Sequence, residues 1–247
     1  MNRVIILKSD RLYAESLRQY VLHLNPRASV TIAISVESAL ELMVAQKVDL
    51  LVSGVGYNMD GDVLDMLAKW NKMAPVRSTK VLIVTARREY RVLVALRTLA
   101  VDGVYDSAAE VPETFSKVLQ LVAGGRRYWS PSIVEHMYQV GSASTAVFRL
   151  LTSFEQVVLS VIGDGCDNTA AARELNLSPA TVSTVRRELH RKLGVQHRGE
   201  LVRVAAQHGF VRFTPAGVVR PGFAMMRASY MARRSKRNRE GSRGMSE

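Results

Sequence analysis

Residues 178–193 combine a helix start, an apolar stripe and a row of cationic side chains. Ser178 followed by Pro179 is typical of a helix that begins with a serine N-cap and a proline at its first position. At about 100° per residue, one side of this helix carries the apolar residues Val182, Val185, Leu189 and Leu193. The opposite side carries hydroxyl and guanidinium groups, which bind base edges and phosphates of DNA. The pattern predicts a recognition helix.

The preceding residues supply the rest of a helix-turn-helix module. Thr152 and Glu155 have the spacing of a capping box, which predicts another helix start. Residues 167–175 begin with a capping Asp167 or Asn168 and are rich in alanine, as expected where a second helix crosses closely. Asn176 and Leu177 form the predicted turn before the recognition helix.

DNA contacts are predicted at two kinds of position. Base contacts are expected from Ser183, Thr184, Arg187 and Arg191, and phosphate contacts from helix starts. The complete predicted set is Thr169, Ser178, Thr181, Ser183, Thr184, Arg186, Arg187, Arg191 and Lys192. The alternative is a helical bundle with a solvated arginine face, which the agreement of caps, turn and basic face disfavours.

The motifs Leu151–Glu155, Gly165, Ser178–Val182 and Arg191–Val195 together resemble the LuxR-type helix-turn-helix. Two positions depart from it: Ala171, where isoleucine or valine is usual, and Val185, where histidine is common. The resemblance implies double-stranded DNA as a partner. It also implies dimerisation, because one recognition helix reads few base pairs and related proteins pair two half-sites.

Charge supports a polyanionic partner. The chain has 34 Lys and Arg against 22 Asp and Glu, a net charge of +12. Residues 1–146 hold 17 basic and 14 acidic groups, residues 147–219 hold 9 and 6, and residues 220–247 hold 8 and 2. Half of the excess therefore lies in the last segment, whose basic run from Arg233 to Arg239 suggests a solvated electrostatic arm. The apolar residues of this segment could instead form a short amphipathic helix against the module or its dimer mate: Phe223, Met225, Met226, Tyr230 and Met231.

Several classes of function are disfavoured. A single cysteine, Cys166, forbids an internal disulfide and fits a cytoplasmic protein. The histidines show no metal-ligand spacing, so no metal or cofactor is expected. No apolar run approaches the length of a membrane span, so no membrane partner is expected either.

The N-terminal half alternates between strand and helix patterns. The expected strands are 4–7, 29–34, 50–53, 81–85 and 103–105, and the expected helices are 12–24, 36–46, 63–69, 91–99 and 112–122. The strand runs are continuously apolar, as in a parallel sheet buried on both faces. This predicts an α/β domain, a flavodoxin-like five-stranded parallel sheet, followed by an all-α four-helix domain.

Together with the module, this half and the motif Ala100–Tyr105 resemble the receiver domain of NarL/FixJ-type response regulators. Phosphoryl transfer in such receivers needs an acceptor Asp, an acidic pair for Mg²⁺, a Thr or Ser, and a Lys. Here the matching positions are Lys8 and Ser9 for the acidic pair, Gly54 for the acceptor, Thr85 for the hydroxyl and Ser107 for the lysine. Only Thr85 fits the pattern, which implies an atypical, RcsB/RcsA-like pseudo-receiver that is not phosphorylated and is not an enzyme.

No nearby carboxylate is a good substitute for the acceptor. Asp49 lies at the opposite end of the third strand, roughly 16 Å from Gly54 at 3.3 Å per residue. Asp10 and Asp60 are displaced from the required positions. Gly54–Gly56 is a weak nucleotide motif and favours a loop, although a small-molecule ligand at this edge of the sheet stays an alternative.

These observations predict four regions: a pseudo-receiver domain at 1–124, a linker at 125–146, a LuxR-type DNA-binding domain at 147–213 and a basic C-terminal tail at 214–247. The predicted function is that of a phosphorylation-independent transcription regulator that works as a homodimer or as a heterodimer with a related regulator. The alternative is a receiver-like interaction subunit whose DNA contacts are auxiliary.

Overall fold

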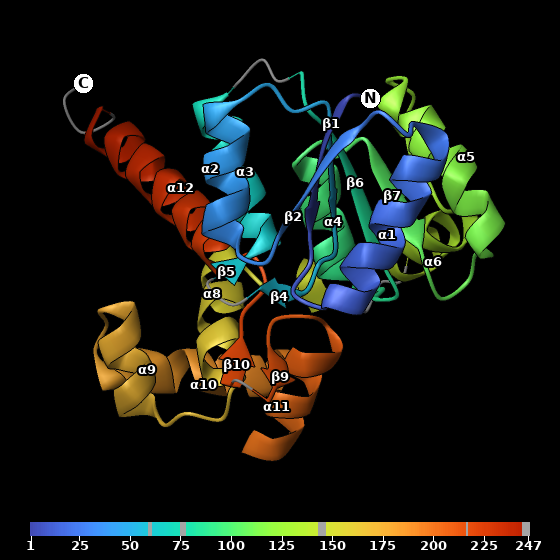
Figure 1. The fold of residues 1–247 in the computed structure, drawn as a ribbon. Helices are drawn as coiled ribbons and strands as arrows, with labels where there is room; N and C mark the ends of the chain where they lie inside the picture. Colours follow the sequence, from blue (N-terminus) through green and yellow to red (C-terminus); the bar gives the residue numbers. More distant parts are fainter. Residues whose placement is uncertain (59–60, 75–77, 143–146, 216, 244–247) are drawn as a thin grey trace. The chain divides into compact units, whose positions relative to one another are not determined.

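The computed structural model describes residues 1–58, 61–74, 78–142, 147–215 and 217–243. The chain divides into two compact units, Met1–Ser142 and Ala143–Glu247 (Figure 1). Each unit has a hydrophobic core of its own.

The first unit is built on a parallel sheet with strand order β2-β1-β3-β6-β7-β8. The strands are β1 (Arg3–Leu7), β2 (Ser29–Ala33), β3 (Leu50–Ser53), β6 (Lys80–Thr85), β7 (Gly103–Asp106) and β8 (Tyr128–Trp129). The central strands are buried along nearly their whole length, which explains their continuous apolar sequences. A short antiparallel pair, β4 (Tyr57–Asn58) and β5 (Gly61–Asp62), follows β3.

Helices cover both faces of this sheet (Figure 1). They are α1 (Arg11–Leu24), α2 (Val36–Ala45), α3 (Val63–Met73), α4 (Tyr90–Thr98), α5 (Pro112–Ala123) and α6 (Pro131–Ser142). α1 and α5 pack on one face, where Leu17 and Val118 meet the strand residues Ile6 and Val52. The predicted α/β fold is confirmed, and all five predicted strand and helix pairs are present.

The structure differs from the sequence prediction after α5. The sequence predicts a linker over 125–146 that contains one short helix, which Ser130 and Pro131 start and which runs through Gln139; in the structure, residues 128–142 form β8 and α6 within the first unit. β8 adds a sixth strand beside β7, and the Ser130 backbone N–H donates to the Val104 carbonyl over 2.9 Å. Ile133 of α6 is fully buried. These contacts fix residues 128–142 on the sheet, and residues 143–146 of the predicted linker lie outside the described residues.

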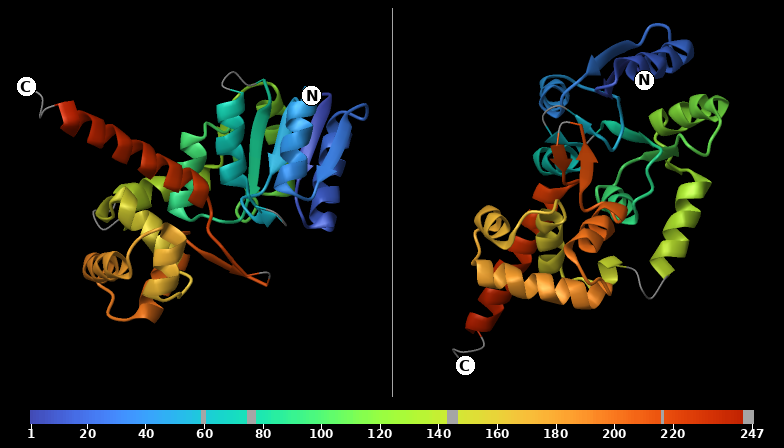
Figure 2. Two further views of the ribbon diagram at one scale, coloured as in Figure 1. Left: turned by 90° about the vertical axis from the view of Figure 1, so that its left-hand side faces the viewer. Right: turned by 90° about the horizontal axis from the view of Figure 1, so that it is seen from below.

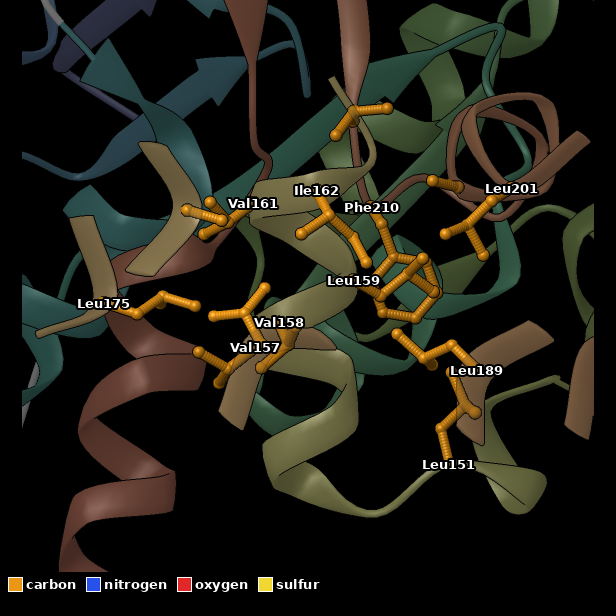
Figure 3. Packing of buried hydrophobic residues seen from close by; sticks show 14 of the residues in the cluster. Leu151, Val157, Val158, Leu159, Val161, Ile162, Leu175, Leu189, Leu201 and Phe210 are labelled. Carbon is orange, nitrogen blue, oxygen red and sulfur yellow. The ribbon is translucent and has the colours of Figure 1, made fainter. Parts of the chain in front are cut away.

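The second unit is mainly helical. Its elements are α7 (Val147–Leu150), α8 (Ser153–Ile162), α9 (Asn168–Leu175), α10 (Pro179–Leu193), α11 (Arg198–Gln207), the hairpin of β9 (Arg212–Thr214) and β10 (Gly217–Val219), and α12 (Phe223–Arg243). Figure 3 shows α8 at the centre of the core, with Leu159 close to Phe210. At Gly163, which ends α8, a Cβ atom would lie 2.6 Å from the Cβ of Ala205, so glycine permits the close approach of α11.

The region after residue 213 is more ordered than a solvated tail. α12 packs on α8, and the rings of Phe154 and Tyr230 stack with centroids 5.2 Å apart. Phe223 and Met226 are partly buried against the same core. Just before α12, Arg220 bridges Asp164 over 2.8 Å and also pairs with Glu174. The apolar residues of this segment therefore support the amphipathic-helix alternative over a wholly solvated arm.

Candidate DNA-binding interface

α9 and α10 form a helix-turn-helix whose turn is set by local chemistry. Asp167 caps α9, accepting from the Ala170 backbone N–H over 2.7 Å. α9 ends at Asn176, which has a left-handed backbone with φ of 56°, a conformation that asparagine tolerates well. Ser178 then caps α10, accepting from the Thr181 backbone N–H over 3.0 Å. The angle between the two helices is thus fixed by capped ends and by the buried, small Ala171 and Ala172.

α10 presents one buried and one exposed side, as its periodicity predicts. Val182 and Leu189 are fully buried in the core. Thr184, Arg187 and Arg191 are exposed, and Ser183 beside them is half-buried. We define these four residues as the recognition face. Hydroxyl and guanidinium groups projecting from one side of a fixed helix are suited to base edges in the major groove.

The two arginines of the recognition face differ in their surroundings. Arg191 pairs with Glu188 one turn earlier, with a nitrogen–oxygen distance of 2.8 Å, and both side chains are largely exposed. Such surface pairs contribute about 1 kcal/mol or less, so Arg191 can exchange Glu188 for a DNA group. Arg187 is exposed near the middle of α10.

The helix starts expected at phosphates lie at the surface. Thr169 is exposed in the first turn of α9, and Ser178 is exposed as the cap of α10. The Ser178 and Thr181 hydroxyl oxygens are 2.8 Å apart. Hydroxyls beside helix N-termini, where backbone N–H groups and the helix dipole favour anions, can bind phosphate oxygens.

The residues that match the phosphorylation site of receiver domains lie at the carboxyl edge of the sheet in the first unit, and one of them is a lysine. Lys8, Gly54, Thr85 and Ser107 come together there, because each ends or follows one of the parallel strands β1, β3, β6 and β7. The Lys8 Nζ lies 3.3 Å from the point that a Cβ on Gly54 would occupy, and 4.5 Å from the centre of the Tyr13 ring. The ammonium group is thus in tight contact distance of the point where a side chain at position 54 would begin.

The electrostatics of the pocket are cationic. Burial lowers the pKa of Lys8, and nearby Arg87 lowers it further, while Asp10 partly offsets the shift. The Thr85 hydroxyl accepts from the Arg87 backbone N–H over 2.9 Å. Ser9 and Ser107 are exposed. This environment lacks the paired carboxylates that bind Mg²⁺ in the matching positions.

Asp10 and Asp49, two carboxylates that the sequence disfavours as substitutes for the missing acceptor, accept hydrogen bonds elsewhere in the first unit. Asp10 caps α1, accepting from the Tyr13 backbone N–H over 3.0 Å. Asp49 accepts from the backbone N–H groups of Asn2 and Arg3 at the other end of the sheet, and these hydrogen bonds lower its pKa. Asp60 lies outside the described residues.

Comparison with known proteins identifies the domain family of the second unit. Residues 149–205 match the family model of bacterial regulatory proteins, luxR family. This segment is a LuxR-type helix-turn-helix domain. The match covers α8, α9, α10 with the recognition face, and most of α11, and it ends before the hairpin and α12.

Relatives of known function are regulators. Transcriptional regulatory protein MctR of Rhizobium johnstonii is 32% identical over 93 residues, which are 38% of this chain and 42% of that protein. Nitrate/nitrite response regulator protein NarP of Escherichia coli is 27% identical over 202 residues, 79% of this chain and 90% of that protein. The match thus spans under half of MctR but nearly all of NarP.

Solved structures show the same order of folds. RcsB from Salmonella enterica serovar Typhimurium, bound to promoter P1flhDC, matches with a TM-score of 0.55 and 19% identity, over 83% of this chain and 98% of that chain. Another solved structure contains two RcsB dimers bound to two parallel DNAs, with 19% identity and a TM-score of 0.55, over 84% of this chain and 99% of that chain. The predicted resemblance to LuxR-type response regulators is therefore confirmed for the fold and the domain order.

Arg186 and Lys192, two of the residues predicted at the DNA, also bind groups of their own domain. The Arg186 Nε donates to the Asn168 side chain over 2.8 Å, and a second nitrogen donates to the Cys166 carbonyl over 3.0 Å. The Lys192 Nζ lies 2.8 Å from a carboxylate oxygen of Glu155. Both cations thus form contacts within their own domain that hold α10 in place, and their predicted DNA contacts stay a prediction.

Glu155 joins the start of α8 to the end of α10. It completes the predicted capping box with Thr152 and also receives Lys192. Burial alone would raise the pKa of Glu155, but the hydrogen bonds from Lys192 and Thr152 outweigh it and lower the pKa. A lowered pKa means that this carboxylate stabilises the fold at neutral pH and that its contribution is lost as the pH falls through the folded-state value.

Within the part of the chain that the structure describes, no group of three or more His, Cys, Asp or Glu is placed to bind a metal ion. Over the same residues, no helix combines the length and apolar character needed to cross a bilayer.

Proposed function

We propose that this chain is a sequence-specific, DNA-binding transcription regulator in which the recognition face of α10 reads the major groove. The supporting observation is that Thr184, Arg187 and Arg191 are exposed together on a helix fixed by caps and core contacts within a LuxR-type domain. Rigid placement matters because base contacts require side chains to be held in position before binding.

The residues around the recognition face have different roles in this proposal. Arg187 and Arg191 donate to guanine edges, and Ser183 and Thr184 contact neighbouring bases. Thr169, Ser178 and Thr181 bind phosphates and set the register on the duplex. Arg186 and Lys192 position the helix through Asn168, Cys166 and Glu155.

The proposed functional form is a dimer, either of this chain or with a related regulator. RcsB, whose fold this chain shares, is seen as dimers bound to DNA. One recognition helix covers only a few base pairs, whereas two place contacts on half-sites one helical turn apart. A regulator of this kind works on chromosomal DNA in the cytoplasm.

We further propose that the first unit is a pseudo-receiver that accepts no phosphoryl group. The Lys8 Nζ lies 3.3 Å from the point that a Cβ at position 54 would occupy, this position is a glycine, and the acidic pair is replaced by Lys8 and Ser9. With neither an acceptor carboxylate nor a Mg²⁺ site, two essential parts of phosphoryl transfer are missing. The unit then serves as an interaction domain.

DNA reading by the chain alone is tested by selecting sequences from a random duplex pool with the purified full-length protein. We expect enrichment of a two-half-site sequence with centres about 10 base pairs apart. Selection of a sequence only after a second regulator is added would favour the interaction-subunit alternative and contradict autonomous reading.

The pseudo-receiver proposal predicts that an aspartate introduced at the acceptor position does not by itself restore phosphorylation. Wild type and Gly54→Asp, incubated with acetyl phosphate and Mg²⁺, should both keep their mass, because Lys8 would pair with the new carboxylate and no acidic pair would hold the metal. Intact-mass measurement checks this. A stoichiometric, base-labile phosphoryl adduct on wild type would refute phosphorylation independence, and one on Gly54→Asp would refute the blocking role of Lys8.

A further inference from the structure

Arg220 lies in the turn between the hairpin and α12, beyond the LuxR-type match. In both views of Figure 2 the hairpin leads directly into α12. Val219, just before Arg220, is buried, and the Phe223 backbone N–H donates to the Arg220 carbonyl over 3.2 Å. The guanidinium carbon lies 5.6 Å from the centre of the Phe223 ring, within the range of a cation–π contact. Backbone and side chain of Arg220 are thus both held where the hairpin joins α12.

The Arg220 guanidinium binds two carboxylates, one before α9 and one in its last turn. One terminal nitrogen donates to Asp164 over 2.8 Å, and the other pairs with Glu174. The Arg220 and Asp164 side chains are only 18% and 19% exposed, so water screens this pair less than a surface pair. Burial alone would lower the pKa of Arg220, but the two carboxylates outweigh it and raise the pKa. Arg220 therefore links the start of α12 to α9 and to the loop before α9.

The loop between α8 and α9, residues 163–167, continues this link to the recognition helix. The other carboxylate oxygen of Asp164 accepts from the Cys166 backbone N–H over 2.7 Å. The Cys166 carbonyl in turn accepts from the Arg186 guanidinium of α10 over 3.0 Å. Arg186 also donates to Asn168, the first residue of α9, over 2.8 Å. An unbroken series of hydrogen bonds thus runs from Arg220 through the loop to α10.

Asp164 is the central group of this series. Burial alone would raise the pKa of Asp164, but the hydrogen bonds from Cys166 and Arg220 outweigh it and lower the pKa. The carboxylate is therefore charged at neutral pH. A partly buried charge that loses its partner keeps the cost of its desolvation. Without Arg220, the Asp164 carboxylate would favour a more hydrated position, and the loop that carries the Cys166 carbonyl would move with it.

We propose that Arg220 is a positioning residue for DNA recognition, because it holds the loop 163–167 in the geometry in which the Cys166 carbonyl binds Arg186 and orients α10. This deepens the proposed function and rests on it. It makes the hairpin and α12 part of the DNA-reading unit, although both lie beyond the LuxR-type match. Base contacts require side chains that are fixed in advance, whereas binding to random DNA depends mainly on charge. Loss of Arg220 therefore affects the selected site more than random DNA.

Two substitutions of Arg220 and one control test this role. Arg220→Gln removes both ion pairs, whereas Arg220→Lys keeps a positive charge but lacks the planar fork that bridges two carboxylates. The matched control is Arg203→Gln, which removes one exposed arginine from α11 of the same unit. Dissociation constants of the full-length proteins are measured for the selected site and for random duplex DNA, at a temperature where circular dichroism shows every variant folded.

We expect Arg220→Gln to lose affinity for the selected site by roughly 2-fold to 30-fold, the range for residues that influence a site without touching its ligand. It should bind random DNA as Arg203→Gln does. Arg220→Lys should lose less than Arg220→Gln, because it still pairs with one carboxylate. Equal losses on the two duplexes would make Arg220 a phosphate contact, and no loss on either would make it purely structural; both results would overturn the proposal.

Asp164→Asn takes the place of Arg220→Gln if that variant does not fold. The asparagine oxygen can still accept from the Cys166 backbone N–H, but the side chain no longer attracts Arg220 as an anion. The same loss of preference for the selected site is expected, in smaller measure. Wild-type preference in a folded Asp164→Asn protein would contradict a role of the Arg220–Asp164 pair in positioning α10.

Hydrogen exchange of the free proteins tests the loop without any DNA. In Arg220→Gln, and in Asp164→Asn where that variant replaces it, the Cys166 amide and the amides of α9 should lose protection relative to Arg203→Gln, while those in the middle of α8 keep theirs. Unchanged protection over residues 163–175 would overturn the proposal. A failure of wild type to select any sequence would instead refute the proposed function, and the exchange measurement would still decide whether Arg220 holds the loop.

Discussion

Replacing Phe210 with alanine is expected to lower the free energy of unfolding of the second unit by about 3–5 kcal/mol. Phe210 is only 1% exposed and is among the largest fully buried side chains of the chain. Figure 3 shows its ring among Leu159, Leu189 and Leu201, which come from three different helices. Alanine would leave a cavity at the point where α8, α10 and α11 meet, and the recognition helix would lose part of its support.

The matched control is Phe213→Ala in the neighbouring hairpin. Phe213 is 56% exposed, so its removal should change stability by about 0.5 kcal/mol or less. Both tryptophans, Trp70 and Trp129, belong to the first unit, so their fluorescence follows that unit during denaturation while helical circular dichroism follows both. The Phe210 variant should shift the dichroism transition and spare the fluorescence transition. Equal shifts for the two variants would contradict the central position of Phe210.

The sheet was predictable because its strands are buried on both faces. A strand such as Val4–Leu7 must then be apolar throughout, and the sequence alone shows this run. The sequence does not predict β8, because a strand of two residues is too short to show a periodic pattern. Its place depends on pairing with Gly103 and Val104 and on the backbone bond from Ser130, and these contacts join residues that are distant in the sequence.

The recognition face was predictable for a related reason. The helical period separates Val182 and Leu189 from Arg187, and the serine cap and following proline fix where the helix starts. The intradomain contacts of Arg186 and Lys192 cannot be predicted from the helical period, because both residues lie beside the exposed side of α10. Their partners Asn168 and Glu155 lie 18 and 37 positions away, so only the folded structure reveals that these cations are paired.

The C-terminal segment shows where composition alone is ambiguous. Its basic run is compatible with a solvated arm, and its apolar residues are compatible with a docked helix. In the structure, the two features follow one another along α12. Phe223, Met226 and Tyr230 pack the first half of the helix against the core of the second unit, and the basic residues come after them in the chain. The deciding element is the Phe154 ring on α8, which offers Tyr230 a stacking partner.

Replacing Arg187 with alanine is expected to weaken binding to the selected DNA site by about 1–3 kcal/mol, roughly 5-fold to 150-fold. A guanidinium group that donates two hydrogen bonds to a guanine edge contributes this much discrimination, and the exposed Arg187 lies near the middle of the recognition face. Binding to random DNA should change much less, because it loses one charge among many. Titrations of both duplexes at one salt concentration measure the two effects.

Arg187→Lys separates charge from geometry. Lysine keeps the positive charge but lacks the planar fork that pairs with a guanine edge. We therefore expect Arg187→Lys to bind random DNA as wild type does, yet to lose most of the preference for the selected site. Lys117→Ala, which removes an exposed charge from the first unit, should leave that preference intact. If Arg187→Lys retained full preference, Arg187 would be a phosphate contact, and sequence reading by α10 would depend on Thr184 and Arg191 instead.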